Sequence, residues 1–234
     1  MDAWMAAWLG AEGWQAVQLS VWVSAVATVI SLPFAVAAAL VLARGQSWAH
    51  QLLNGLVHLP LILPPVVTGY LLLILFGRQG VIGSFLEQTT GLVFGFRWTG
   101  AALASAVMAF PLMVRAIRLS IEAVDPRLHQ AAATLGANAP LRFLVITLPM
   151  ILPGVVAGAV LGFAKAMGEF GATITFVANI PGETQTIPAA IYALLAIPGG
   201  DAAAWRLVLI SLGISMAALI ASEWFARRAK AGAR

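Results

Sequence analysis

Two charged side chains in the second half of the chain are the first candidates for chemistry. Lys165 and Glu169 stand four residues apart, about one helical turn, in a strongly apolar region. An ionisable pair inside a membrane is a functional hypothesis by default, and a lysine turned inward would attract a dianion. At 1.5 Å per residue, however, Lys165 lies about 34 Å along a helix from Arg142, beyond an apolar core of about 30 Å. We therefore expect both charges to be interface anchors or a rim of the outer mouth.

The residue types present exclude several other chemistries. The chain has no cysteine, so disulfides, thiolate metal sites and thiol redox chemistry are excluded. The three histidines, His50, His58 and His129, lack metal-ligand spacing and are interpreted as solvated or interface residues. The sequence holds no nucleophile-elbow, zinc-protease or Walker motif. We expect a non-catalytic chain that binds no metal or cofactor and cannot hydrolyse ATP alone.

The composition of the chain is that of an integral membrane protein. Hydrophobic residues make up 61% of the chain and charged residues 9%, with a mean hydropathy of +0.94, whereas soluble domains carry about 25% charged residues. The chain is predicted to be one membrane domain, 1–234, in a lipid bilayer. Its first apolar run is too long for a cleaved signal peptide. The net charge of +4 comes without a basic patch of interleaved aromatics, so nucleic-acid binding is not expected.

Charge-free windows predict an all-α, polytopic helical fold of about five spans. The windows are 15–43, 45–77, 98–114, 143–164 and 207–222. The second window contains Pro60, Pro64 and Pro65, which remove helix hydrogen bonds, and a broken helix is tolerated in a bilayer only inside protein or beside a cavity. We expect this span to be kinked or broken, interior and pathway-lining. Residues 187–197 are too few to cross, so we expect a re-entrant or interfacial half-helix.

Basic residues predict the orientation of these spans, because they gather in cytoplasmic loops. With five spans, an outer N-terminus and a cytoplasmic C-terminus, nine of the 13 Lys and Arg residues lie inside. These nine are Arg44, Arg115, Arg118, Arg127, Arg142, Arg227, Arg228, Lys230 and Arg234. The same orientation places the polar stretch 125–149 on the cytoplasmic side.

This polar stretch carries the capping signals of a short helix. Asp125 is a favourable N-cap, and Pro126 suits the first helical position. Gly136 ends the helix, and Asn138 with Pro140 begins another. Four apolar residues recur on one face of the predicted helix 126–135: Leu128, Ala131, Ala132 and Leu135. Because the central residues of this face are alanines, the backbone of a partner protein could approach it closely. The alternative interpretation is an ordinary interfacial helix between two spans.

The same stretch resembles the E-A-A, G, I-x-L-P loop of bacterial ABC importer permeases. The matching residues are Gln130, Ala131, Ala132, Gly136, Ile146, Leu148 and Pro149. Gln130 replaces the usual glutamate, which keeps the hydrogen-bonding capacity of the side chain but not its charge. The resemblance implies a type I permease fold in which residues 125–140 hold a cytoplasmic coupling helix that docks on a separate ATPase. The residues expected at this contact are Leu128, Gln130, Ala131, Ala132, Leu135 and Gly136.

Two further runs look like the molybdate-importer branch of these permeases. They are GEFGATITFVANIPGETQTIP at 168–188 and HLPLILPPVVTGYLLL at 58–73. The resemblance implies a homodimeric permease of the bacterial inner membrane that moves molybdate, with tungstate as a co-substrate, by alternating access. Two cytoplasmic ATPase subunits holding ATP and magnesium would drive it, and a periplasmic binding protein would deliver the oxyanion. A sulfate or thiosulfate permease is the alternative in the same class, and a free-standing anion channel is the alternative outside it.

Two further sets of residues are assigned to the pathway and to helix packing. The expected pathway or gate residues are Pro64, Pro65, Thr68, Gly168, Glu169 and Thr173. A line of small residues at four-residue intervals allows two helices to approach closely. These residues are Gly154, Gly158, Gly162 and Ala166. Their partner is either another helix of the same chain or the second copy, against which this face would pack or slide during opening.

Overall fold

The computed structural model describes residues 8–45 and 47–232, and the regular elements in those residues are all helical. The helices are α2 (Ala11–Arg44), α3 (Trp48–Ile62), α4 (Pro65–Phe76), α5 (Val81–Thr90), α6 (Trp98–Glu122), α7 (Pro126–Thr134), α8 (Ala139–Arg142), α9 (Leu148–Met167), α10 (Gly171–Val177), α11 (Ile187–Leu195) and α12 (Asp201–Gly232). A π-helical turn, η1 (Phe143–Thr147), joins α8 to α9. The predicted all-α fold is confirmed.

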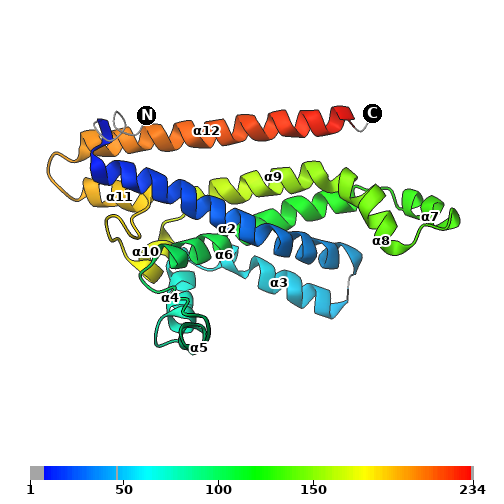
Figure 1. Cartoon of the computed structure of the whole chain (residues 1–234), viewed down its shortest axis with the longest axis horizontal. Coiled ribbons are helices and arrows are strands. Elements are labelled where there is room, and N and C mark those ends of the chain that lie inside the picture. The colour runs from blue at the N-terminus through cyan, green and yellow to red at the C-terminus, as the bar shows by residue number, and fades with distance from the viewer. Residues whose placement is uncertain (1–7, 46, 233–234) are drawn as a thin grey trace.

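The long helices α2, α6, α9 and α12 run along the longest axis of the molecule (Figure 1). α7 and α8 lie at one end of this axis, where α12 also ends. α10 and α11 lie toward the other end, where α2 and α12 begin. The chain therefore starts its first long helix at one end and finishes its last at the end that carries α7.

By length and composition, four stretches of the described residues are suited to crossing a membrane. They are Ala11–Arg44, Trp98–Glu122, Ala139–Met167 and Asp201–Ala221. α3 and α4 qualify only as a pair, bent by 112° at the break between them. Pro64 and Pro65 account for the bend, because proline cannot continue the hydrogen bonding of a helix and disfavours helical backbone in the residue before it. The prediction of about five spans, the second of them broken, agrees with this count.

Small side chains allow α2 and α6 to pack closely. Ser20, Ser24 and Ala27 of α2 are buried, as are Ala104 and Ser105 of α6. Residues of this size bring helix backbones together in lipid, where association depends on close packing rather than on exclusion of water. This pair forms the centre of the bundle.

The glycines of α9 pack within the chain, which decides between the two alternatives for that face. A Cβ atom on Gly154 would collide with Ser120, one on Gly158 would lie 3.2 Å from the backbone oxygen of Met113, and one on Gly162 would lie 2.6 Å from the sulfur of Met113. The partner of this glycine face is therefore α6 of the same chain. The face is not free to contact a second copy.

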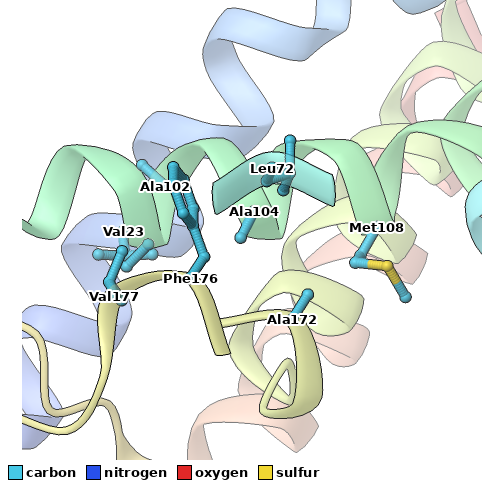
Figure 2. Close-up of a cluster of buried hydrophobic side chains, with 9 residues drawn as sticks. Val23, Leu72, Ala102, Ala104, Met108, Ala172, Phe176 and Val177 are labelled. Atoms are coloured by element: carbon cyan, nitrogen blue, oxygen red, sulfur yellow. The ribbon is translucent and has the colours of Figure 1, made fainter. Parts of the chain in front are cut away.

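A buried apolar cluster joins α4 and α10 to this bundle. Val23 of α2, Leu72 of α4, Met108 of α6 and Phe176 of α10 belong to this cluster, whose members are drawn in Figure 2. Phe176 is the largest of the fully buried side chains. The cluster holds the two short helices that carry three of the six expected pathway residues, Pro65, Thr68 and Thr173.

The first half of the broken span is little enclosed within one chain. Val57 is the one buried residue of α3, whereas Leu52, Leu56 and Ile62 are exposed. The helices of one chain therefore do not enclose α3, and its expected interior, pathway-lining position stays a prediction. The prolines determine where the helix breaks, but they do not determine which neighbours cover it.

The short apolar run near 187–197 forms α11, which spans nine residues. At about 1.5 Å per residue it is too short to cross a bilayer, as predicted. Its first residue is fixed to the bundle, because the Ile187 N–H donates to Ser20 Oγ of α2 at 2.7 Å. The run is therefore a packed half-helix at the end of the molecule opposite α7.

Candidate functional site

The sequence signals at 125–126 produce the start of α7. The Asp125 carboxylate accepts a hydrogen bond from the Arg127 N–H at 2.9 Å, and Pro126 occupies the first turn, where its missing N–H costs nothing. The helix ends at Thr134, one residue earlier than predicted, with Leu135 as its C-cap. Both ends are thus fixed by local chemistry rather than by burial.

Gly136 closes α7 with a Schellman motif. It has a φ of 83°, in the left-handed region that non-glycine residues rarely adopt. Its N–H donates to the Ala133 carbonyl at 3.0 Å, and the Ala137 N–H donates to the Ala132 carbonyl at 3.0 Å, the bond pair that defines this cap. Asn138 then caps α8, because its side-chain oxygen accepts from the Leu141 N–H at 3.0 Å.

The surface of α7 is open. Neither α7 nor α8 has a buried residue. Leu128 is 41% exposed and Leu135 is 87% exposed, and between them Ala131 is exposed and Ala132 half-buried. An apolar side chain such as Leu135 gains nothing from exposure to water, so this face is suited to being covered by a partner.

One side chain connects α7 to the α8 that follows it. Arg142, the last residue of α8, donates from its guanidinium group to the His129 carbonyl of α7 at 3.3 Å. η1 and α9 continue directly from α8. A displacement of α7 can therefore be transmitted through this hydrogen bond and α8 to the spanning helix α9.

If α7 is the coupling helix that the resemblance implies, replacing Gly136 with Val should leave membrane insertion intact and reduce ATP-driven transport several-fold. A Cβ here would meet no atom within 4 Å, so the cost is left-handed backbone strain, about 1–2 kcal/mol and more for a β-branched residue. Uptake into cells or vesicles measures the effect. Gly136→Asn is the matched control and should retain most transport, because Asn tolerates this conformation. Normal uptake by the Val variant would contradict a functional role for the cap.

The six expected pathway residues lie around the contact between α4 and α10. Thr68, Glu169 and Thr173 are buried, while Pro64, Pro65 and Gly168 are exposed. A Cβ on Gly69 would lie 2.5 Å from the Ala172 carbonyl oxygen, and one on Gly171 would lie 2.7 Å from Pro65. The two helices therefore touch backbone to backbone, and the exposed members lie next to this contact along the chain.

Three buried hydroxyl groups, one each on α2, α4 and α6, have no hydrogen-bond partner among the described residues. They are Ser24 Oγ, Thr68 Oγ1 and Ser105 Oγ. By contrast, Thr173 Oγ1 donates to the Phe170 carbonyl at 2.9 Å. A buried polar atom left unpaired is costly, so the Thr68 hydroxyl lacks a partner that its burial calls for.

Lys165 and Glu169 form an ion pair, which the sequence analysis did not expect, while their expected place at the outer interface stays a prediction. Lys165 Nζ lies 2.7 Å from Glu169 Oε2, and the Glu169 side chain is 1% exposed against 29% for Lys165. The helix α9 ends at Met167, so Glu169 does not extend outward on it. Instead its second oxygen accepts from the Ala172 N–H of α10 at 3.0 Å.

The histidines have local structural partners. His50 Nδ1 is hydrogen-bonded to Ser47 Oγ at 2.7 Å, and His58 Nδ1 to the Asn54 carbonyl at 2.8 Å. Within 8–45 and 47–232, no three His, Asp or Glu side chains gather as a metal site would require. Both hydrogen bonds are local, since they join residues three and four positions apart in the chain.

Sequence reasoning missed two features of this region. It did not predict α10 as a separate short helix. It also did not predict that the Glu169 carboxylate accepts a hydrogen bond from the first turn of that helix. A signal was present, because a glutamate between Gly168 and Phe170 in an apolar stretch requires buried partners. The contact of Gly69 with Ala172 had no such signal, since a glycine does not identify the helix it faces.

Comparisons with known proteins agree with this geometry. A family model described as binding-protein-dependent transport system inner membrane component matches residues 13–231. The molybdenum transport system permease protein ModB of Escherichia coli strain K12 is 56% identical over 221 residues, covering 94% of this chain and 96% of that protein. The ModB protein of Haemophilus influenzae is 55% identical over 213 residues, covering 91% and 93%.

A similar fold occurs among solved structures. The structure of a bacterial alginate ABC transporter, in complex with an alginate pentasaccharide-bound periplasmic protein, matches with a TM-score of 0.72 at 17% identity. The match covers 92% of this chain and 78% of that chain. At this identity the likeness establishes the fold, which is that of an ABC importer permease.

Proposed function

The chain belongs to the family of binding-protein-dependent transport system inner membrane components, and from this membership we propose that it is the permease of an ABC importer for molybdate. The observation that carries the substrate is the 56% identity to a molybdenum permease over 94% of the chain. The fold supports the same role, because its spanning helices form a bundle with a short open helix at one end. Tungstate, an oxyanion of the same shape and charge, is a co-substrate.

The permease crosses the inner membrane with its N-terminus outside and its C-terminus in the cytoplasm. α7 lies at the end of the molecule where α12 finishes (Figure 1). Arg127 and Arg142, in and beside α7, are basic residues of the kind that favour the cytoplasmic side. This orientation presents α7 to the cytoplasm and α11 to the outer surface.

The open face of α7 is the docking site for a cytoplasmic ATPase. Two ATPase subunits, which hold ATP and magnesium, would each grip one coupling helix of a permease homodimer. ATP binding drives transport only if the ATP-bound partner favours one packing of the spans over the other. The permease itself performs no covalent chemistry.

The pathway forms between two copies of the chain beside the contact of α4 and α10. The weak burial of α3 and the exposed residues Val66 and Tyr70 of α4 leave an apolar surface for a second copy and for lipid. Thr68, Glu169 and Thr173 are buried behind this surface, and Pro64, Pro65 and Gly168 lie on it. A periplasmic binding protein delivers the oxyanion at the opposite end from α7, onto the segments 79–97 and 180–205.

Reconstitution of the permease with its ATPase and binding protein tests this function. Vesicles should accumulate radiolabelled molybdate when ATP is supplied to the ATPase side, and unlabelled tungstate should compete while sulfate should not. A preference for sulfate would identify the chain as a sulfate permease instead. Accumulation that persists without the ATPase would instead identify a channel and overturn the proposal.

A further inference from the structure

A basic cavity of about 410 Å³ lies at the base of the coupling helix. Its walls come from the end of α2, the end of α6, the start of α7 and the α8–η1 junction. These elements meet at the α7 end of the molecule (Figure 1). The cavity is therefore placed where spanning helices leave the apolar core.

Positive charge in this cavity is not neutralised by the chain. Arg44 and Arg142 both line it, together with His129, and no described carboxylate does. The nearest acids in sequence are already engaged, because Glu122 pairs with Arg118 at 2.7 Å and Asp125 caps α7. The described residues provide no ion-pair partner for either Arg44 or Arg142.

Arg142 also carries a donor with no acceptor. One terminal nitrogen donates to the His129 carbonyl, but Nε is buried and has no hydrogen-bond partner among the described residues. A buried donor left unpaired costs roughly 1–3 kcal/mol, and each such group in a folded protein requires an explanation. An anion in the cavity would supply the missing acceptor.

The remaining walls of the cavity are apolar. Leu40, Ile121, Val124 and Phe143 line it beside the two arginines. A guanidinium group pairs well with a tetrahedral oxyanion, whose oxygens accept its N–H groups in parallel. The apolar walls add a preference for an oxyanion that carries hydrocarbon, and basic pockets between cytoplasmic helix ends are known to fit lipid headgroups.

We propose that this cavity binds a tetrahedral oxyanion between Arg44 and Arg142, supplied by the phosphate of an anionic phospholipid. A bound phosphate would connect the end of α2 to the end of α8 and so steady the base of the coupling helix. The bilayer composition would then tune the coupling of ATP to transport. Binding is a property of the permease alone, so it is measured separately from the transport function proposed above.

The test measures lipid binding to the purified full chain. Permease freed of lipid in detergent is mixed with dioleoylphosphatidylglycerol or dioleoylphosphatidylcholine, and bound lipid is counted by native mass spectrometry. Wild type should retain phosphatidylglycerol preferentially, and Arg44→Gln/Arg142→Gln should lower its affinity about tenfold, equal to roughly 1.4 kcal/mol. Arg44→Lys/Arg142→Lys keeps both charges and should lie between the two.

The matched control is Arg78→Gln/Arg97→Gln, which removes the same charge from segments near the start of α6 and should change affinity less than twofold. A second arm titrates inorganic phosphate and molybdate into the same proteins by calorimetry. Arginine-dependent binding of these ions, without a lipid preference, would assign the cavity to a free oxyanion. Equal binding by wild type and the double Gln variant in both arms would overturn the site.

Discussion

Tryptophan at both Ala131 and Ala132 is expected to abolish co-purification of the ATPase and ATP-driven uptake, while the permease still inserts into the membrane. These alanines are the small residues at the centre of the exposed face of α7, between the larger Leu128 and Leu135. Two indole rings would hold a partner's backbone away from the helix. Because α7 has no buried residue, the substitution should leave the bundle folded.

The measurement is a pull-down from membranes with a tagged permease. The ATPase recovered should fall at least tenfold, which corresponds to about 1.4 kcal/mol of lost binding free energy. Ala133→Trp is the control for position, because it adds one indole ring on a different side of α7 and should retain most of the ATPase. Wild-type recovery by the Ala131→Trp/Ala132→Trp variant would remove the docking site from this face. Equal loss in the control would mean that the partner surrounds the helix.

The parts of the site that sequence predicted well are those that local hydrogen bonds determine. Asp125, Gly136 and Asn138 each fix a helix end through atoms only a few residues away. Capping depends on the type of the side chain and on the backbone conformation that this residue type favours. Both can be inferred from the sequence. The bounds of α7 were therefore accurate to one residue.

The parts that sequence predicted poorly depend on which helices meet. The ion pair of Lys165 and Glu169 was not predicted, because the distance argument assumed one continuous helix, whereas α9 ends at Met167 and α10 begins at Gly171. Likewise, Pro64 and Pro65 located the break in the second span but not the contact of Gly69 with Ala172. Spacing along a chain gives the period of a helix, whereas its neighbours are set by the packing of the whole bundle.

The glycines of α9 illustrate the same limit. Their four-residue spacing predicted a close helix contact, and that contact exists. It did not distinguish α6 of the same chain from a second copy, because both partners would meet the same small surface. The positions of Ser120 against Gly154 and of Met113 against Gly158 and Gly162 decide between them.

The Lys165–Glu169 pair is expected to be the most sensitive charged site in the bundle. Lys165→Met would leave the Glu169 carboxylate, 1% exposed, charged and without its cation. Removing one partner of a buried pair costs about 3–5 kcal/mol, and the partial exposure of Lys165 places this case at the lower end of that range. Because Glu169 also caps α10, which packs against α4, uptake should fall with stability.

Glu169→Gln should be milder than Lys165→Met. The amide oxygen still accepts from the Ala172 N–H, and Lys165, being 29% exposed, can turn toward water. Thermal unfolding of the purified permease in detergent should rank wild type above Glu169→Gln and Glu169→Gln above Lys165→Met. The double variant should resemble Glu169→Gln, because the second change then removes a cation with no charged partner.

Glu122→Gln provides the control, since it breaks the other ion pair of the same i,i+4 spacing. Arg118 and Glu122 are 33% and 43% exposed, and exposed pairs contribute about 0–1 kcal/mol. Its unfolding temperature should stay close to that of wild type. Coupled residues depart from additivity in a double-mutant cycle, so equal and additive effects at Lys165 and Glu169 would mean that the pair is not coupled. The anchoring of α10 would then rest on the apolar cluster around Phe176 alone.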